Sequence, residues 1–225
     1  MKRSIILILA GTLLLSCTGC GDTDNGSKGP AKQLPKQCTA AELEQKGIGI
    51  TYESGSADTL HALDGPFIDT KITNEEEALQ AVASLSDMIG CKDFYDEIRL
   101  YTVDSSMGFT HYIFAQYYED IPFMTHRIIL HVNEETQMIE YLTSAYIPEV
   151  NVSTKPDIST EDAKLKAEEA VPDHKFTNEP ELALITKNKT SYLIWACSDQ
   201  TKEAFAWIDA HSGEVLYSDN GERTD

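Results

Sequence analysis

The feature that most limits how this chain folds is an order of elements that occurs twice, a capped helix followed by several short strands. The first helix is indicated by a capping box at residues 73–76, apolar residues at helical spacing and a stop at Gly90. Runs rich in β-branched and aromatic residues follow, separated by short polar turns, at 97–103, 109–118, 121–132 and 138–146. Such a series predicts an antiparallel meander.

The second occurrence of this order is smaller. A cap at residues 159–162 begins a helix that Pro172 ends, because proline cannot continue a helix. Strand-like runs follow at 181–186, 191–198, 204–210 and 214–218. Helix then sheet, twice, predicts the α+β class with two small domains, each a helix packed on an antiparallel sheet. A chain of 225 residues is long enough for two such cores.

One strand-like run carries two histidines that suggest a metal site, in the stretch THRIILHVNEE at residues 125–135. A zinc-peptidase helix needs H-E-x-x-H, in which the two ligands lie four residues apart on one helical face. His126 and His131 are five residues apart, and an odd offset on a strand sends two side chains to opposite faces. We therefore expect two ordinary strand histidines, no shared ion and no metal site.

The charge balance argues against one class of partner. The chain has 18 lysines and arginines against 37 aspartates and glutamates, which gives a net charge of −19. A surface of this sign repels the phosphates of DNA and RNA. We therefore expect no nucleic acid among its partners.

The N-terminus has the features of an export signal. Two basic residues precede an apolar run at 5–15 that is too short to span a bilayer as a mature helix. The run ends in Leu-Leu-Ser-Cys17, which resembles the lipobox of bacterial lipoproteins, whereas Cys20 lacks an aliphatic residue three positions before it. We expect residues 1–16 to be a lipoprotein signal peptide, and Cys17 to carry the lipid that anchors the protein at the extracytoplasmic face of a bacterial cell membrane. The alternative is an ordinary secretory signal that is cut nearby, with Cys17 discarded.

Three cysteines remain for the folded part of the chain, Cys38, Cys91 and Cys197. No two of them form a C-x-x-C pair, so the sequence contains neither a zinc ribbon nor a thioredoxin motif. Two states stay open at this point. Either one disulfide forms and leaves one thiol, or all three cysteines are thiols.

Four short stretches resemble the prosegments of thermolysin-like metallopeptidases. The stretches FAQYYEDIPF at 114–123 and IILHVN at 128–133 are similar to the fungalysin/thermolysin propeptide domain. ISTEDA at 158–163 and WIDAHSGEVL at 207–216 resemble the PepSY domain, which follows that domain in such prosegments. The resemblance covers roughly 65–218, and the order of the motifs is the same. The sequence departs from the family in having Thr136 where a glycine is usual, and in containing no H-E-x-x-H.

Composition and resemblance together predict how the chain is divided. Residues 18–36 are rich in Gly, Asp, Ser, Lys and Pro and read as a flexible spacer. The expected division is a signal peptide at 1–16, a flexible tether and short N-terminal segment at 17–64, a fungalysin/thermolysin-propeptide-like domain at 65–150 and a PepSY-like domain at 156–219.

The sequence gives no support for an enzyme. A serine nucleophile needs a base and an orienting group, and Ser105, Ser106 and Ser191 lie in turn or strand contexts without an elbow such as G-x-S-x-G. Adjacent acidic residues such as those at 75–77 and 134–135 are explained as solvated charges of a first helical turn and a loop. We expect no catalytic residues and no cofactor.

Two functional hypotheses from different classes remain. The resemblance implies a non-catalytic protein-interaction module that inhibits, or assists the folding of, a secreted thermolysin-like metallopeptidase in trans. In prosegments the stretch after PepSY leads into the enzyme, so we expect partner contact at Tyr217, Glu222, Arg223 and Asp225. Glu222, Arg223 and Asp225 are also consistent with a frayed, solvated chain end. The second hypothesis is a surface scaffold for an envelope component or a membrane protein unrelated to peptidases.

Overall fold

The computed structural model describes residues 32–53, 59–201 and 203–222. By its internal contacts the chain divides into Met1–Lys32 and Gln33–Asp225, and the second unit is the one described here. The expected signal peptide at 1–16 and the expected lipidation site Cys17 lie outside the described residues. Among the described residues no helix is both long and apolar enough to cross a membrane.

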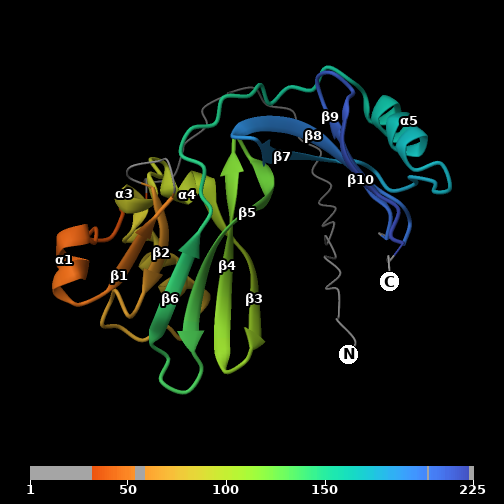
Figure 1. Cartoon of the computed structure of the whole chain (residues 1–225). Coiled ribbons are helices and arrows are strands. Elements are labelled where there is room, and N and C mark those ends of the chain that lie inside the picture. Colours follow the sequence, from red (N-terminus) through yellow and green to blue (C-terminus); the bar gives the residue numbers. More distant parts are fainter. Residues whose placement is uncertain (1–31, 54–58, 202, 223–225) are drawn as a thin grey trace, which may run out of the picture. The chain divides into compact units, whose positions relative to one another are not determined.

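The first half of this unit contains an antiparallel sheet, the N-terminal sheet, with short helices (Figure 1). Its elements are α1 (Ala40–Gln45), β1 (Gly49–Tyr52), β2 (Leu60–Asp64), α2 (Glu75–Ala83), α3 (Ser86–Ile89), α4 (Phe94–Glu97), β3 (Ile98–Ser106), β4 (Phe109–Tyr118), β5 (Ile121–Asn133) and β6 (Ile139–Ser144). The strands pair in the order β1, β2, β6, β5, β4, β3, and all of these pairs are antiparallel. The predicted meander is therefore confirmed.

The N-terminal sheet includes two strands that precede residue 65, where the sequence placed the start of the propeptide-like domain. Leu43 of α1 and Leu60 and Leu63 of β2 are buried in the same hydrophobic cluster as the rest of this half. Strands β1 and β2 are short, and residues 54–58 between them lie outside the description. Short strands of mixed composition give little periodic signal, which explains why the sequence did not indicate them.

The first predicted helix is present but differs in two details. Its N-cap is Asn74, whose side chain accepts from the Glu77 N–H at 2.9 Å, while Thr73 bonds to the Glu77 carboxylate. The predicted box was therefore one residue early. The helix also stops at Ala83, and a second short helix, α3, continues to the predicted stop at Gly90, which has φ +83°.

The two faces of the N-terminal sheet have opposite character. One face is built from residues that lie opposite one another on neighbouring strands and are buried, among them Leu63, Leu142 and Leu130. These side chains share one hydrophobic cluster with buried residues of α2, α3 and α4. Side chains alternate along a strand, so the adjacent positions point to the other face. We call this the outer face.

The second half of the unit has one helix and a smaller antiparallel sheet, the C-terminal sheet. Its elements are α5 (Thr160–Ala170), β7 (Glu181–Lys187), β8 (Thr190–Ser198), β9 (Phe205–Asp209) and β10 (Val215–Asp219). Ser159 caps α5 as predicted, since its hydroxyl accepts from the Asp162 N–H at 3.1 Å, and Pro172 follows the helix end. Ala163 and Ala167 of α5 pack with Ala206 and Ile208 of β9. The α+β class is confirmed for both halves.

Strand β5 connects the two sheets. Its residue Phe123 pairs in parallel with Leu184 of β7, and the two side chains share a small buried cluster with Leu193 and Ala210. Between the Ala115–Arg127 and Tyr117–Pro122 pairs, β4 advances by two residues and β5 by five, so β5 carries three extra residues. This irregularity lies between the part of β5 that pairs with β7 and the part that pairs with β6.

Candidate functional site

Strand β10, which carries the predicted contact residue Tyr217, forms one edge of the C-terminal sheet. β10 pairs with β9 and, among the described residues, with no other strand. The turn before it is fixed by the buried Asp209, whose carboxylate accepts from the N–H groups of His211 and Ser212, both at 2.8 Å. Gly213 then takes φ +75°, which favours glycine. An edge strand presents backbone N–H and C=O groups that another extended chain can pair with.

Three aromatic side chains lie together on one face of this edge. The Tyr217 ring lies 5.5 Å from the Phe205 ring and 5.1 Å from the Trp207 ring, measured between centroids. Tyr217 keeps 44 % of its surface exposed, whereas Phe205 and Trp207 are half-buried. We call these residues the aromatic trio. Exposed aromatic groups supported by their neighbours are typical of contact residues in protein interfaces.

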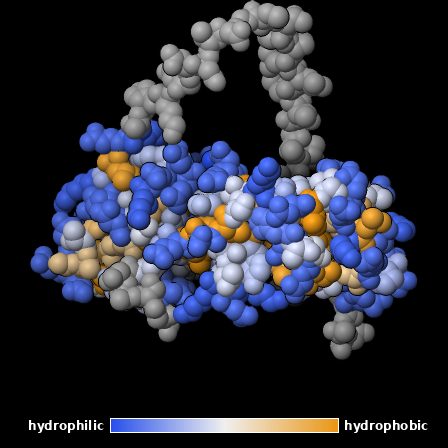
Figure 2. Space-filling view, turned by 90° about the horizontal axis from the view of Figure 1, so that it is seen from above, coloured by the Kyte–Doolittle hydropathy of each residue, from blue (hydrophilic) through white to orange (hydrophobic). Residues whose placement is uncertain are grey.

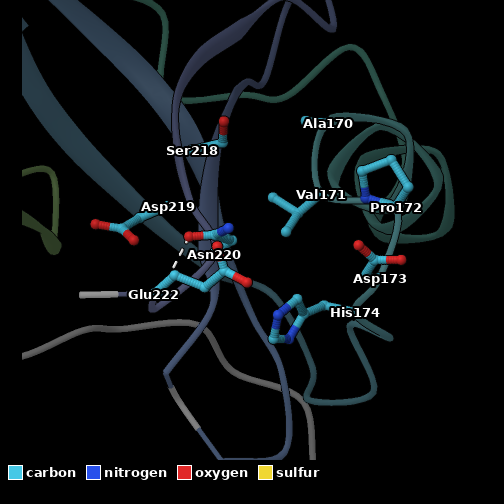
Figure 3. A pocket seen from close by; sticks show the side chains of 9 residues that line it. All are labelled: Ala170, Val171, Pro172, Asp173, His174, Ser218, Asp219, Asn220 and Glu222. Carbon is cyan, nitrogen blue, oxygen red and sulfur yellow. Dashed lines mark hydrogen bonds between the residues drawn. The ribbon is translucent and has the colours of Figure 1, made fainter. Parts of the chain in front are cut away.

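A pocket of about 350 Å³ lies between the end of α5 and the end of β10 (Figure 3). In Figure 3 the side chains of Val171 and His174 face Asn220 and Glu222, while Asp219 points to the other side. The pocket's residues are Ala170, Val171, Pro172, Asp173, His174, Ser218, Asp219, Asn220 and Glu222. The edge strand thus has the pocket at its end and the aromatic trio on its face.

The pocket is acidic. Asp173 and Glu222 line it, Asp219 borders it with its side chain turned away, and within the described part of the chain none of these carboxylates forms an ion pair. His174 is held by Asp199, with 3.1 Å between Nδ1 and Oδ2. Figure 2 shows a surface that is largely hydrophilic with hydrophobic patches between.

Beside the aromatic trio lies a second hollow of about 620 Å³, which includes Met124, Phe205, Trp207 and Cys197. Burial raises the pKa of the Cys197 thiol to about 11, and burial raises the pKa of Cys91 to about 12. Both groups are therefore protonated thiols at neutral pH, a form that reacts slowly. Cys38, Cys91 and Cys197 are all free, which decides between the two states that the sequence left open.

Two of the four predicted contact residues lie at this site, and their contact with a partner stays a prediction. Tyr217 belongs to the aromatic trio, and Glu222 lines the pocket. Arg223 and Asp225 lie outside the described residues. No cluster of three or more His, Cys, Asp or Glu side chains suited to a metal occurs in the described ranges.

The two histidines of the opening motif do not approach each other. His126 packs against Phe123, with 5.1 Å between ring centroids. His131 instead meets His111 on β4, with 2.7 Å between their Nδ1 atoms, and Ser106 Oγ lies 3.0 Å from His111 Nε2. The sequence gave no signal for this group, because the three extra residues in β5 shift the register that a simple hairpin predicts.

Ser106, His111 and His131 have the contacts that a serine nucleophile, its base and an orienting group would need. Ser106, however, is an exposed residue next to the turn between β3 and β4. Acyl transfer also needs donors for the oxyanion and a site that excludes water. These contacts therefore orient the imidazoles and do not by themselves make a catalytic site.

Comparison with known families assigns the second half of the unit. Residues 157–219 match the family described as the peptidase propeptide and YPEB domain, abbreviated PepSY. This segment is a PepSY domain. It holds α5, the C-terminal sheet and most of the pocket, so the aromatic trio and β10 belong to the PepSY domain.

Two solved structures are similar to this chain at low identity. The Bacillus megaterium YpeB C-terminal domain is 15 % identical, with a TM-score of 0.41, over 82 % of this chain and 98 % of that one. A Clostridium difficile 630 protein described as a lipoprotein is 7 % identical, with a TM-score of 0.23, over 69 % of this chain and 99 % of that one. No curated protein matches the chain.

Proposed function

We propose that this chain is a non-catalytic, lipid-anchored extracytoplasmic module whose PepSY domain binds a secreted metallopeptidase of the thermolysin type and inhibits it or assists its folding in trans. The observation that carries the proposal is the exposed edge strand β10 inside a segment that matches a peptidase-propeptide family. In this proposal residues 65–150 act as the fungalysin/thermolysin-propeptide-like domain suggested by their sequence.

Binding would use the edge of the PepSY sheet. An extended segment of the partner adds a strand to β10 through backbone hydrogen bonds, and its alternate side chains give specificity. Side chains on one face of the added strand would meet Tyr217 and Trp207 of the aromatic trio, and the partner chain beyond it would pass the pocket at Glu222. Backbone pairing supplies affinity, and the exposed aromatic ring supplies a contact that a substitution can test.

Membrane anchoring through Cys17 would replace the covalent link that joins a prosegment to its enzyme. A chain in trans depends on the concentration of its partner, and confinement to one membrane surface raises the effective concentration. With a net charge of −19, attachment to anionic lipids by charge alone is unfavourable, so the lipid itself would hold the chain.

The binding test is a titration of soluble chain, starting at residue 18, against secreted metallopeptidases of the same organism, with activity and refolding yield as readouts. We expect Tyr217→Ala to weaken the effect about tenfold, the loss typical of an interface aromatic residue. Tyr101→Ala is the matched control, because Tyr101 is similarly exposed, at 48 %, but lies on the N-terminal sheet. The control should bind like the unaltered chain.

Two outcomes would count against the peptidase partner. If micromolar concentrations of the chain change neither the activity nor the refolding yield of any of these enzymes, the result favours the scaffold hypothesis. If Tyr101→Ala and Tyr217→Ala weaken the effect on the peptidase equally, β10 is not the binding edge.

The anchor is tested separately by fractionating cells. Cys17→Ser should move the protein out of the membrane fraction and leave an unprocessed or soluble form, because the thiol that carries the lipid is gone. Cys20→Ser is the control and should stay in the membrane. The reverse result would assign the lipid to Cys20.

A further inference from the structure

The outer face of the N-terminal sheet contains a close contact between two imidazoles. His111 of β4 and His131 of β5 lie directly opposite each other, with 2.7 Å between their Nδ1 atoms. Their rings are nearly perpendicular, with centroids 4.8 Å apart. A hydrogen bond at this distance requires one Nδ1 to carry a proton and the other to accept it.

Neighbouring strands hold both rings in place. His131 stacks on the ring of Tyr141 of β6, with 3.7 Å between centroids and 14° between planes, and only 9 % of His131 is exposed. On the other side, Ser106 Oγ of β3 lies 3.0 Å from His111 Nε2. Whether that hydroxyl donates or accepts, the imidazole pair is satisfied by a single proton between the two Nδ1 atoms.

The charged and titratable groups around the pair are few. From β3, Asp104 occupies the position opposite His111. From β6 the facing group is Tyr141, and beyond it Asp64 of β2 lies opposite Tyr141. The positions next to the pair on the same face of β4 and β5 are uncharged, namely Phe109, Ile113, Ile129 and Asn133.

This arrangement accepts a first excess proton but not a second. A cationic His111 would have the Asp104 position on one side and could donate from Nδ1 to a neutral His131. Protonation of His131 as well would place two N–H groups head to head and two positive charges in contact. No carboxylate faces His131 from the strands packed against it in the described residues.

We propose that the His111–His131 pair is a proton-operated switch, closed while the two rings share one Nδ1 proton and opened when both are protonated. Opening moves the His131 ring off Tyr141 and so changes the outer face of the N-terminal sheet. Burial, with a smaller contribution from His111, lowers the pKa of His131 to about 4, so the switch is closed at neutral pH and opens in acid. The switch is independent of the proposed peptidase partner.

The test follows the histidine and tyrosine ring resonances of the chain by NMR between pH 3.5 and 8. We expect His131 to titrate about two pH units below the ordinary value of 6.5 for a histidine, and the ring resonances of Tyr141 to shift with the same midpoint. The indole N–H of Trp207, on the PepSY sheet, should not follow this transition. If His131 titrates near 6.5, or if the Tyr141 resonances do not shift with it, the proposal is overturned.

Substitution separates the switch from a merely buried histidine. In His111→Gln the amide oxygen can accept from a protonated His131, so the His131 midpoint should rise by about one pH unit or more and Tyr141 should stay still. His126→Gln, on the same strand but away from the pair, should leave both midpoints unchanged. An unaltered Tyr141 transition in His111→Gln would contradict the proposal, and if that variant does not fold, the joint titration in the unaltered chain decides alone.

Discussion

The two helix-covered sheets of this chain fill their cores with side chains of different size. The N-terminal sheet and its helices bury one large cluster that includes Phe67, Phe94 and Phe114. The PepSY domain has smaller clusters, and α5 contributes the fully buried alanines Ala163 and Ala167 to one of them. Both helices begin with similar caps, so their sequence signals alone suggest equivalent units.

This difference indicates that the two halves contribute unequally to the stability of the chain. Deep burial of large apolar groups is the main source of stability, so the N-terminal half should carry most of it. Small residues such as Ala167 and Ala206 let α5 lie close to β9, which makes that contact depend on shape more than on area. The PepSY domain, by contrast, has the edge strand β10 with Tyr217 exposed on it.

The largest effect should come from the N-terminal core. Phe114→Ala removes a fully buried ring and should lower the free energy of unfolding by about 3–5 kcal/mol, measured by urea denaturation. Tyr101→Ala, at an exposed site of the same sheet where the Arg127 guanidinium lies over the ring at 4.5 Å, should lower it by no more than about 1 kcal/mol. If Phe114→Ala lowers the free energy of unfolding as little as the control does, the N-terminal core does not carry most of the stability.

The next largest effect is a dependence of the free energy of unfolding on pH that arises from His131 in the N-terminal sheet. The pKa of His131 falls from its ordinary 6.5 to about 4 in the folded chain, so its contribution is complete above pH 6.5 and is lost as pH falls toward 4. Between pH 7.5 and 4 this amounts to about 3 kcal/mol. The difference between the unaltered chain and His131→Gln isolates this contribution from other titrating groups, and a difference that does not vary with pH would contradict it.

A smaller effect should come from overfilling the contact between α5 and β9. Ala167→Leu adds atoms at a fully buried position and should lower the free energy of unfolding by about 1–3 kcal/mol. Leu165→Ala on the same helix, at a residue 60 % exposed, is the control. Its free energy of unfolding should stay within about 0.5 kcal/mol of that of the unaltered chain. If Ala167→Leu stabilises the chain, the contact is looser than the buried alanines indicate. Denaturation followed by tryptophan fluorescence reports on this half, because both tryptophans of the chain, Trp195 and Trp207, lie on its sheet.

The smallest effect compares the two helix caps directly. Asn74→Ala and Ser159→Ala each remove one side-chain acceptor from a helix N-terminus and should each cost about 1 kcal/mol. Hydrogen exchange should show the loss in α2 for the first variant and in α5 for the second. A cost for Thr73→Ala greater than that for Asn74→Ala would instead support the cap position expected from the sequence.

The sequence by itself determined the features that depend on neighbours along the chain. The cap at Ser159, the stop at Gly90 and the bounds of β4 were all predictable, because capping, left-handed glycine and alternation act over a few residues. The strand predicted at 214–218 is also present, as β10 (Val215–Asp219).

Tertiary structure decided what depends on partners distant in sequence. The three extra residues in β5 set the register that places His131 opposite His111, and a register shift leaves the composition of a strand unchanged. The same irregularity lies beside Phe123, where β5 pairs with the PepSY sheet. Strands β1 and β2 are fixed by packing against the common core and by pairing with β6, because four or five residues alone carry too little pattern to specify a strand.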